Sequence, residues 1–361
     1  MKRFLICNPH GIGDVLFSTP MVRVLKERFP DSFIGYLCNR RTEEILKTNP
    51  RLDRLYVYEK DEFRRTWRLS PGEAFRKGAA LFRELRNDRF EVLLDLSLAP
   101  EFSLLLKWAG IPRRIGLDYK HRGRFLTDRV FLPGLDDGSV SRHYLDTLCP
   151  LGIDSSGISY PTELCVTEAD DQFADSFFRG QGLQEEVIGI APGGGTTHGS
   201  RASYKQWGAS RFARLCDLFQ QRRKAKVLLF SAPTEEALSD QLVEEAKEKP
   251  VVARGITVRQ MASLMKRCRL IVCNDGGPLH VAVSIGRPTV SLFGPTDPEV
   301  YGPYPANPLR HAVVSQPVAC TPCYQRFKLP DCAQNVCLSW ISPETVFAAA
   351  QRLLDGKVDS R

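Results

Sequence analysis

Short apolar runs alternate with helical stretches along nearly the whole chain, and this alternation constrains the fold more than any other feature. In the first half, runs such as RFLIC (3–7) and FEVLLDL (90–96) are short and rich in β-forming residues, and amphipathic stretches such as GEAFRKGAALFRELRN (72–87) lie between them. Strands and helices that alternate at this spacing predict a parallel sheet with helices on both faces.

The same alternation starts again after a loop-like stretch, GIDSSGISYPTEL (152–164), with an expected strand at EVIGIA (186–191). Because 361 residues are more than one hydrophobic core usually serves, we expect two domains, 1–164 and 165–361. The predicted fold class is α/β, with two Rossmann-like, doubly wound domains that face a cleft. The last helix, SPETVFAAAQRLL (342–354), is expected to pack either within its own domain or back on the first.

Composition restricts the class of protein. Hydrophobic residues make up 43% and charged residues 25% of the chain, as in ordinary globular proteins. The start, MKRFLICNPH, has too short an apolar run for a signal peptide. No stretch contains the roughly 18 consecutive apolar residues of a membrane-spanning helix. We therefore expect a cytoplasmic protein.

The net charge of +8 is unevenly distributed. Between Lys60 and Arg124, 15 Lys and Arg residues stand against 9 Asp and Glu residues. Two interpretations stay open: a solvated surface, or a patch that binds phosphate groups of an acidic lipid headgroup or of nucleic acid. No nucleic-acid-binding motif accompanies the patch, which favours an anionic lipid-linked molecule and predicts no nucleic-acid partner.

One long motif, VCNDGGPLHVAVSIGRPTVSLFGPTDP (272–298), has the form of a phosphate site. A strand is expected to end at Asn274 and a helix to start near Pro278. Ligands of open α/β sheets bind at such strand ends, and the free N–H groups of a helix N-terminus favour a phosphate. The alternative is a helix capped by an aspartate and followed by a buried histidine. The candidate residues in and after the turn are Asp275, Gly276, Gly277 and His280.

A second glycine-rich motif, IAPGGGTTHGSRASYKQW (190–207), also follows an expected strand. Its glycines, Gly193, Gly194 and Gly195, form a candidate backbone nest for a phosphate, with Lys205 as a point charge. The spacing is not that of a P-loop. In GIGDVL near the start, Leu16 replaces the third glycine of the dinucleotide-binding fingerprint, so a nicotinamide dehydrogenase loses most of its support.

Together with GIGDVLFSTP (11–20), these two motifs resemble the three signatures of glycosyltransferase family 9, the ADP-heptose:lipopolysaccharide heptosyltransferases. Their order and separation match across nearly the whole chain. The resemblance implies a GT-B fold, with the acceptor domain first and the nucleotide-sugar domain second. It also implies inverting transfer of a heptose from ADP-heptose to a hydroxyl of the lipopolysaccharide inner core.

The resemblance implies site residues one by one. Asp14 matches the general base, Lys205 the lysine that contacts donor phosphate, and Glu235 an acidic residue near the ribose, with Glu236 an equally available neighbour. Many relatives have Thr or Ser at the position of Gly276. The donor residues are Gly193, Gly194, Gly195, Lys205, Glu235, Asp275, Gly276, Gly277 and His280. The acceptor residues are Gly13, Arg64, Arg65, Lys120 and Arg122.

The chemistry of these residue types agrees with an inverting transfer. A single displacement needs a base for the acceptor proton and positive groups for the departing diphosphate. Glycine N–H groups, the helix N-terminus and Lys205 would supply the latter without a catalytic cofactor. A structural alternative for the first motif makes Ser18 or Thr19 a helix cap with Pro20 at the first helical position, and leaves Asp14 in the preceding loop.

Four of the eleven cysteines cluster with the spacing C-x2-C-x8-C-x4-C. They are Cys320, Cys323, Cys332 and Cys337. Reduced structural thiols are one interpretation, and four ligands for a structural zinc or iron are another. The middle spacing is shorter than in zinc ribbons, which weakens the match, and disulfides are disfavoured in a reducing compartment. Among relatives of the family, some that glycosylate proteins carry a cysteine-bound iron.

The expected partners are an ADP-heptose donor, an anionic lipid-linked acceptor and the inner membrane surface, on which the cytoplasmic protein would bind peripherally. Alternatives are transfer of another sugar, transfer to a protein acceptor, and a non-catalytic nucleotide-sugar binder. A metal-ribbon nucleic-acid protein rests only on the cysteines and the basic patch. Retention of Asp14 together with Lys205 argues against pure binding, because binding does not need a base.

Overall fold

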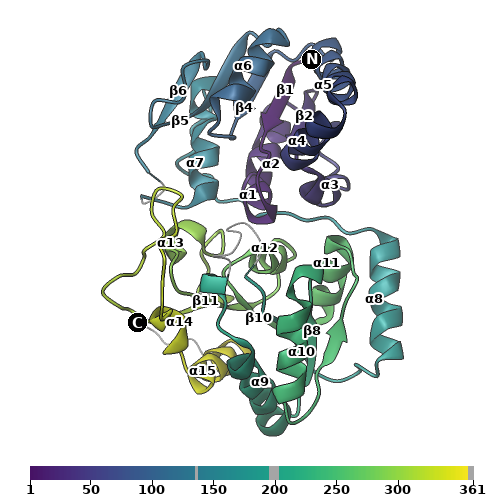
Figure 1. Cartoon of the computed structure of the whole chain (residues 1–361), viewed down its shortest axis with the longest axis vertical. Coiled ribbons are helices and arrows are strands. Elements are labelled where there is room, and N and C mark those ends of the chain that lie inside the picture. Colours follow the sequence, from purple (N-terminus) through teal and green to yellow (C-terminus); the bar gives the residue numbers. More distant parts are fainter. Residues whose placement is uncertain (135–136, 195–202, 357–361) are drawn as a thin grey trace. The chain divides into compact units, whose positions relative to one another are not determined.

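The computed structural model describes residues 1–134, 137–194 and 203–356, and the chain divides into two compact units, Met1–Glu163 and Leu164–Arg361. The division predicted from the sequence follows residue 164. In each unit, helices lie on both sides of a central sheet (Figure 1). None of the described helices is long and apolar enough to cross a lipid bilayer.

The first unit contains a parallel sheet with the strand order β3-β2-β1-β4-β5-β6. This is the Rossmann order, in which the connections reverse direction between β1 and β4, so ligands are expected at the carboxyl ends of these two strands. The strands are β1 (Arg3–Cys7), β2 (Phe33–Cys38), β3 (Arg54–Val57), β4 (Val92–Asp95), β5 (Arg113–Tyr119) and β6 (Asp128–Leu132). The helices are α1 (Ile12–Phe17), α2 (Thr19–Arg28), α3 (Arg40–Leu46), α4 (Lys60–Leu69), α5 (Pro71–Asn87), α6 (Pro100–Trp108) and α7 (Val140–Asp146).

The second unit repeats this topology, with the order β12-β11-β10-β7-β8-β9 and a switch point between β7 and β10. Its strands are β7 (Val187–Ala191), β8 (Lys226–Phe230), β9 (Val251–Ala253), β10 (Leu270–Asn274), β11 (Thr289–Phe293) and β12 (His311–Ser315). Its helices are α8 (Glu168–Gly180), α9 (Ala209–Leu218), α10 (Glu236–Glu245), α11 (Val258–Arg267), α12 (Gly277–Ser284), α13 (Pro298–Tyr301), α14 (Val336–Ser339) and α15 (Pro343–Leu354).

The helix ends follow local sequence signals. Helix α8 begins with a capping box, in which Thr167 accepts from the backbone N–H of Asp170 and the Asp170 carboxylate accepts from that of Thr167. Ser342 caps α15 by accepting from Thr345, and α15 packs against α9 and β12 within the second unit. One expectation is corrected: Asp14 lies in the first turn of α1, not in a loop before the helix.

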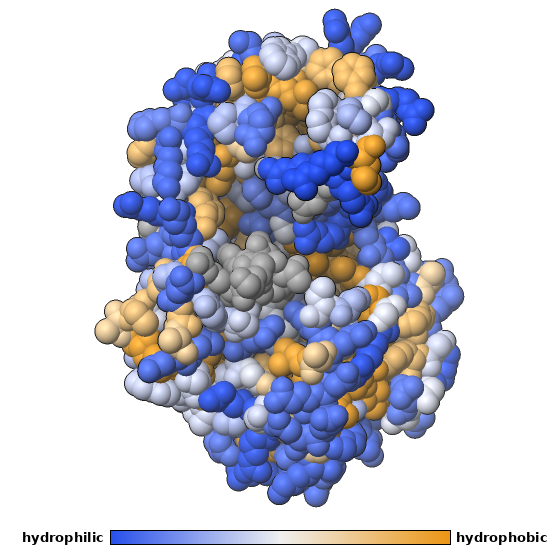
Figure 2. All heavy atoms as spheres, viewed as in Figure 1, coloured by the Kyte–Doolittle hydropathy of each residue, from blue (hydrophilic) through white to orange (hydrophobic). Residues whose placement is uncertain are grey.

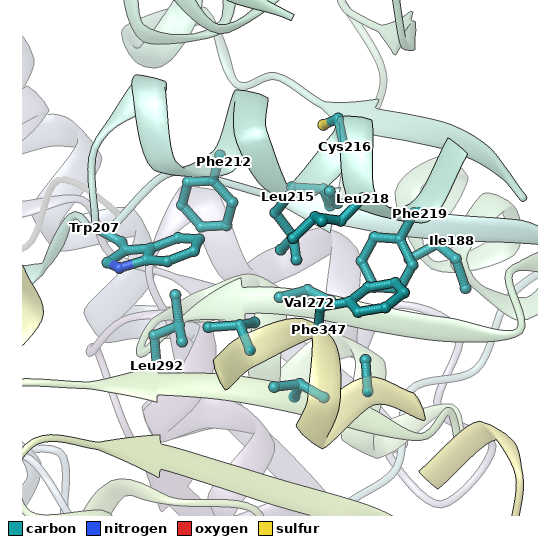
Figure 3. Packing of buried hydrophobic residues seen from close by; sticks show 14 of the residues in the cluster. Ile188, Trp207, Phe212, Leu215, Cys216, Leu218, Phe219, Val272, Leu292 and Phe347 are labelled. Carbon is teal, nitrogen blue, oxygen red and sulfur yellow. The ribbon is translucent and has the colours of Figure 1, made fainter. Parts of the chain in front are cut away.

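Two pairs of aromatic side chains lie within the largely aliphatic core of the second unit (Figure 3). The rings of Trp207 and Phe212 meet edge to face with centroids 4.9 Å apart, and those of Phe219 and Phe347 lie 5.2 Å apart. Such pairs contribute about 0.5–1.5 kcal/mol beyond the burial of their surface. The indole N–H of the fully buried Trp207 donates to the carbonyl of Ile341 at 3.0 Å. The chain segment just before α9 is therefore fixed to the core.

Candidate functional site

A buried ion pair lies at the carboxyl end of β10. The Nζ atom of Lys205 is 2.6 Å from Oδ2 of Asp275, and the two side chains are 12% and 5% exposed. The hydroxyl of Thr296, which follows β11, donates to the same carboxylate oxygen at 2.6 Å. Burial by itself would raise the pKa of Asp275, but Lys205, Thr296 and His280 together lower it below its ordinary value. Asp275 is thus held as a carboxylate beside its counter-charge.

Asn274 connects the loops around this ion pair. Its amide nitrogen donates to the carbonyls of Pro192 (2.6 Å) and Gly193 (3.3 Å), which follow β7. Its amide oxygen accepts from the backbone N–H of Trp207 at 3.2 Å. Since Trp207 is anchored in the core, these bonds fix the position of Lys205, two residues earlier. Sequence analysis missed Asn274, although a polar residue at the end of a buried strand was the available signal.

Glu235 packs directly on the glycine turn after β7. A Cβ atom on Gly193 would lie 1.9 Å from Oε2 of Glu235, so only a glycine leaves room for this carboxylate. Gly194, beside it, is buried, and Gly195 lies outside the described residues. Glu236 is exposed at the start of α10. Of the two acidic neighbours left open by the sequence, Glu235 is therefore the one that reaches the glycine turn.

The turn between β10 and α12 leaves an accessible helix N-terminus. Gly276 and Gly277 are partly exposed, and Gly276, at the N-cap position, has no side chain that could cap the helix. His280, on the first turn, is 5% exposed and acts electrostatically on Asp275. The free N–H groups of the helix, Lys205 and the glycine turn after β7 thus come together at one edge of the sheet. This arrangement can bind a phosphate group.

In the first unit, Gly13 and Asp14 lie just beyond the carboxyl end of β1. Both are partly exposed. Asn8, which is fully buried, donates from Nδ2 to the backbone carbonyl of Asp14 at 3.1 Å. The buried Asn39 donates to the backbone carbonyl of His10. Two buried amides thus hold the start of α1, which carries Asp14 in its first turn, at the switch point of the sheet.

A second carboxylate, Asp95, ends β4 and was not singled out from the sequence. It accepts hydrogen bonds from the backbone and hydroxyl of Ser97 at 3.0 and 2.6 Å and from the hydroxyl of Ser103. Burial raises its pKa despite these bonds and despite the nearby His10. Asp95 lines a small pocket between the ends of β4 and β5. Other residues of its lining are Ser103, Arg122, Leu98, Leu117 and Leu126.

The predicted acceptor residues do not form one cluster. Arg64 and Arg65 are exposed on α4, after β3, whereas Lys120 and Arg122 lie in the turn after β5. Strands β3 and β5 are separated by β2, β1 and β4, a distance of roughly 19 Å at the usual spacing of strands. The two pairs therefore flank the carboxyl end of β1 from opposite sides.

The turn that carries Lys120 is built with backbone strain. Lys120 and His121 both have left-handed conformations, with φ of 52° and 57°. The carboxylate of Asp118 accepts from the N–H of Gly123 at 2.8 Å and holds the far side of the turn. Left-handed non-glycine residues cost of order 1–3 kcal/mol each and persist where the surroundings fix them. The cationic side chains of Lys120 and Arg122 are thus presented by a fixed turn.

The predicted zinc or iron site is not formed among the described residues. Cys320, Cys323, Cys332 and Cys337 are all free thiols, and no described group of three or more His, Cys, Asp or Glu side chains is arranged to hold a metal ion. Burial and then the other three cysteines raise the pKa of Cys337 to about 11, so the four lie in one region. The thiol of Cys337 donates to the side-chain oxygen of Asn335 at 3.5 Å, and the sulfur of Cys332 accepts from the backbone N–H of Asn335 at 3.2 Å.

The structure thus has two units with the Rossmann strand order, and the second has an arrangement at its switch point that can bind a phosphate group. The comparisons with known proteins specify the class. The family model of glycosyltransferase family 9 (heptosyltransferase) matches residues 79–333. The chain belongs to this family and is a glycosyltransferase.

Individual relatives agree with this assignment. Lipopolysaccharide heptosyltransferase 3 of Escherichia coli is 25% identical over 82% of this chain and 84% of its own length. The crystal structure of a glycosyl transferase family 9 protein from Veillonella parvula is similar with a TM-score of 0.78, 27% identity and coverage of 98% and 97% of the two chains. For the E. coli ADP-heptose lps heptosyltransferase II, the TM-score is 0.72 at 22% identity, over 98% of each chain. These similarities confirm the predicted GT-B fold class.

Proposed function

We propose that the protein transfers a heptose from ADP-heptose to a hydroxyl of the lipopolysaccharide inner core, with inversion at the anomeric carbon. One observation carries the proposal: in a family 9 chain, Lys205, Asp275 and the N-terminus of α12 lie together at the switch point of the second unit. The names of similar proteins, a lipopolysaccharide heptosyltransferase and an ADP-heptose enzyme, supply the donor and acceptor classes.

In this proposal, the second unit (residues 165–361 by the sequence boundary) holds the donor. The diphosphate lies at Gly193, Gly194, Gly277 and the helix N-terminus, and Lys205 neutralises part of its charge. Glu235 lies near the ribose. Asp275 positions Lys205 through the 2.6 Å contact and is not itself placed against the phosphates. Positive groups that are already in place stabilise the leaving ADP without reorganisation during the reaction, and the proposal includes no catalytic cofactor.

The first unit (residues 1–164) holds the acceptor. Asp14 takes the proton of the acceptor hydroxyl while the oxygen of that hydroxyl bonds to the anomeric carbon. The bond from the anomeric carbon to the diphosphate oxygen breaks in the same step. ADP leaves with the electron pair. Lys120 and Arg122 on one side of β1, and Arg64 and Arg65 on the other, bind anionic groups of the acceptor. Because that acceptor is lipid-linked, we place the reaction at the cytoplasmic surface of the inner membrane.

The test is a donor and acceptor screen with the purified full chain. Release of nucleotide is measured with ADP-heptose, GDP-mannose and UDP-glucose, each with and without a Kdo-containing lipid acceptor. We expect ADP release only with ADP-heptose and the acceptor together, and a product whose anomeric configuration is opposite to that of the donor. Release with another sugar nucleotide, retention of configuration, or donor binding without any turnover would contradict the proposal.

A further inference from the structure

The hairpin of α4 and α5 exposes large apolar side chains next to arginines. Trp67, Leu69 and Phe75 are 51%, 80% and 70% exposed, respectively. We call the surface they form with neighbouring arginines the α4–α5 patch. It comprises Trp67, Leu69 and Phe75 with Arg64, Arg65, Arg68 and Arg76. Over the two helices, the surface shows strongly hydrophilic and strongly hydrophobic side chains in contact with one another (Figure 2).

Packing of the hairpin involves only part of this group: Trp67 stacks on Phe63 with ring centroids 6.2 Å apart, yet about half of its surface stays exposed. The inner face of the hairpin is held by Phe63, whose ring lies 5.8 Å from that of Tyr58 and against Gly78 of α5. Tyr58 in turn meets Phe102 edge to face at 5.5 Å. Exposed apolar residues are ordinary when scattered, but a contiguous group of them marks an interaction surface.

The arginines of the patch carry charge that no described acidic side chain neutralises. Arg64, Arg65, Arg68 and Arg76 form no ion pair within the part of the chain whose side chains the structure describes. Lys77, one residue further along α5, behaves differently, since it pairs with Glu62 and Glu73 at 3.5 and 3.2 Å. The patch therefore presents a positive potential around an apolar centre.

We propose that the α4–α5 patch docks the protein on the surface of an anionic lipid bilayer. Leucine, phenylalanine and tryptophan would enter the headgroup boundary while Arg68 and Arg76, which are not assigned to the acceptor, contact lipid phosphates; this is the composition of interfacial helices. Nucleic acid would use the arginines and the aromatic rings, but it gives no role to an aliphatic residue as exposed as Leu69. The inference names the membrane-binding surface of the proposed enzyme, and it rests on the proposed function only for the presence of a bilayer near the acceptor.

The test is co-sedimentation of the full chain with vesicles that contain neither donor nor acceptor. Vesicles of phosphatidylcholine mixed with phosphatidylglycerol are compared with phosphatidylcholine alone. We expect binding to the anionic vesicles that weakens when salt is raised from ~0.1 M to ~1 M, because the Debye length shortens from about 10 to about 3 Å. Failure here leaves the transferase assay with an acceptor in detergent untouched, so the two proposals fail separately.

Two variants divide the patch into its parts. Arg68→Gln with Arg76→Gln lowers the vesicle partition coefficient roughly 25-fold, because each cation near an anionic surface contributes about fivefold. Trp67→Ser with Phe75→Ser lowers it about 10-fold or more through lost insertion. The matched control is Trp108→Ser with Phe131→Ser, on α6 and β6, whose side chains are 65% and 71% exposed outside the patch. It leaves the partition unchanged.

A spectroscopic arm reports insertion directly. Brominated lipids in the bilayer quench the fluorescence of Trp67, and the quenching is lost in Trp67→Phe while binding persists. Equal binding to neutral and anionic vesicles, or an equal loss in the control variant, would overturn the inference. So would vesicle binding that the patch variants do not change together with RNA binding that they abolish, since the patch would then bind nucleic acid. Unchanged circular dichroism in every variant excludes unfolding as the cause.

Discussion

At the switch point of the first unit, the buried carboxylate of Asp95 is surrounded by the hydroxyl groups of Ser97 and Ser103, whereas at that of the second unit the buried carboxylate of Asp275 lies against Lys205. The strand order of the two sheets is the same. The pKa values nevertheless move in opposite directions, upwards for Asp95 by burial and downwards for Asp275, where Lys205 and its other partners outweigh burial.

This difference separates the contribution of topology, which sets where a ligand can bind, from that of the side chains, which set the kind of group that binds there. The Rossmann order determines that ligands meet the sheet at β1 and β4, and at β7 and β10. Which group binds there depends on the side chains: in the second unit, Lys205 and the N-terminus of α12 lie at the switch point and can bind an anion. At the first switch point Asp14 is partly exposed and is not among the residues that line the pocket of Asp95, which include Ser103 and Arg122. Under the proposed function, the second site receives the diphosphate of the donor, and the first receives the acceptor hydroxyl whose proton Asp14 takes.

The largest effect is expected from the exposed carboxylate of the first unit. Asp14→Asn should lower kcat by about 10²–10⁴-fold, because a positioned general base contributes that much, and should leave the KM for donor unchanged. The backbone bond from Asn8 to residue 14 does not involve the side chain, so folding is preserved. Initial rates with varied donor and thermal unfolding measure the two quantities.

The control for this variant is Asp31→Asn, which removes an exposed carboxylate from a loop of the same unit. It should keep the full rate. Near-normal turnover in Asp14→Asn would remove Asp14 from its role, and the first switch point would then have no assigned base.

Removal of Lys205 should leave a buried carboxylate without a cationic partner at the second switch point, as at the first. Lys205→Met leaves Asp275 buried without its counter-charge, and we expect a loss of about 3–5 kcal/mol in the free energy of unfolding, with loss of donor binding. Lys266→Met is the control. Lys266 pairs with Asp171 at 2.9 Å, but the two side chains are 36% and 34% exposed, so this ion pair should contribute less than about 1 kcal/mol to the free energy of unfolding. Urea unfolding at pH 7 compares the two.

The pH dependence of that variant has a definite sign. In the native protein the lowered pKa of Asp275 stabilises the fold above the ordinary value of 3.8, and this contribution is lost as pH falls through the lower folded value. In Lys205→Met, burial raises the pKa above 3.8, so the variant should become more stable as pH falls from 7 towards 4. A variant that instead loses stability over that range would show that Lys205 does not determine the charge state of Asp275.

The sequence predicted the strands of both switch points but not the contacts between them. Runs such as RFLIC and RLIVCN are apolar throughout because parallel strands are buried on both faces, and this signal is local. The polar residues Asn274 and Thr296 act across the sheet, between loops far apart in the chain, and local patterns do not contain such pairings. Helix α4 was missed for another reason: its exposed arginines and tryptophan do not follow the apolar repeat of a core-facing helix.

The cysteine motif is a local pattern that left two interpretations open, reduced thiols and a structural metal site. Two pairs of thiols at short spacing allowed a metal site, and in the structure Cys332 and Cys337 form hydrogen bonds with Asn335. The spacing brings thiols into one region, but their orientation depends on the left-handed turn at Asn335 and on packing of Cys337 near Gly294. Those are tertiary features.

A smaller effect is expected at Gly193, where the absence of a side chain leaves room for the carboxylate of Glu235. In Gly193→Ala the new Cβ displaces the carboxylate of Glu235, and the donor KM should rise about tenfold. In a Glu235→Ala background the same change should cost nothing. Gly157→Ala is the control, since no atom lies within 4 Å of a Cβ at that position. Additive effects of Gly193→Ala and Glu235→Ala on KM would show that the two residues do not share a ligand subsite.

The smallest effect is expected from Gly276→Ser, which adds a hydroxyl group at the second switch point. Gly276 is extended, with φ of 165°, and a Cβ there would lie 3.5 Å from the carbonyl oxygen of Gly194, an ordinary contact. Gly276→Ser should therefore change the free energy of unfolding by less than about 0.5 kcal/mol. Its hydroxyl lies at the mouth of the site and should tighten donor binding about fivefold, the value of one neutral hydrogen bond. Gly276→Ala, measured by calorimetry with ADP, separates the hydroxyl from the added bulk; if alanine and serine bind ADP equally well, no phosphate oxygen lies within reach of residue 276.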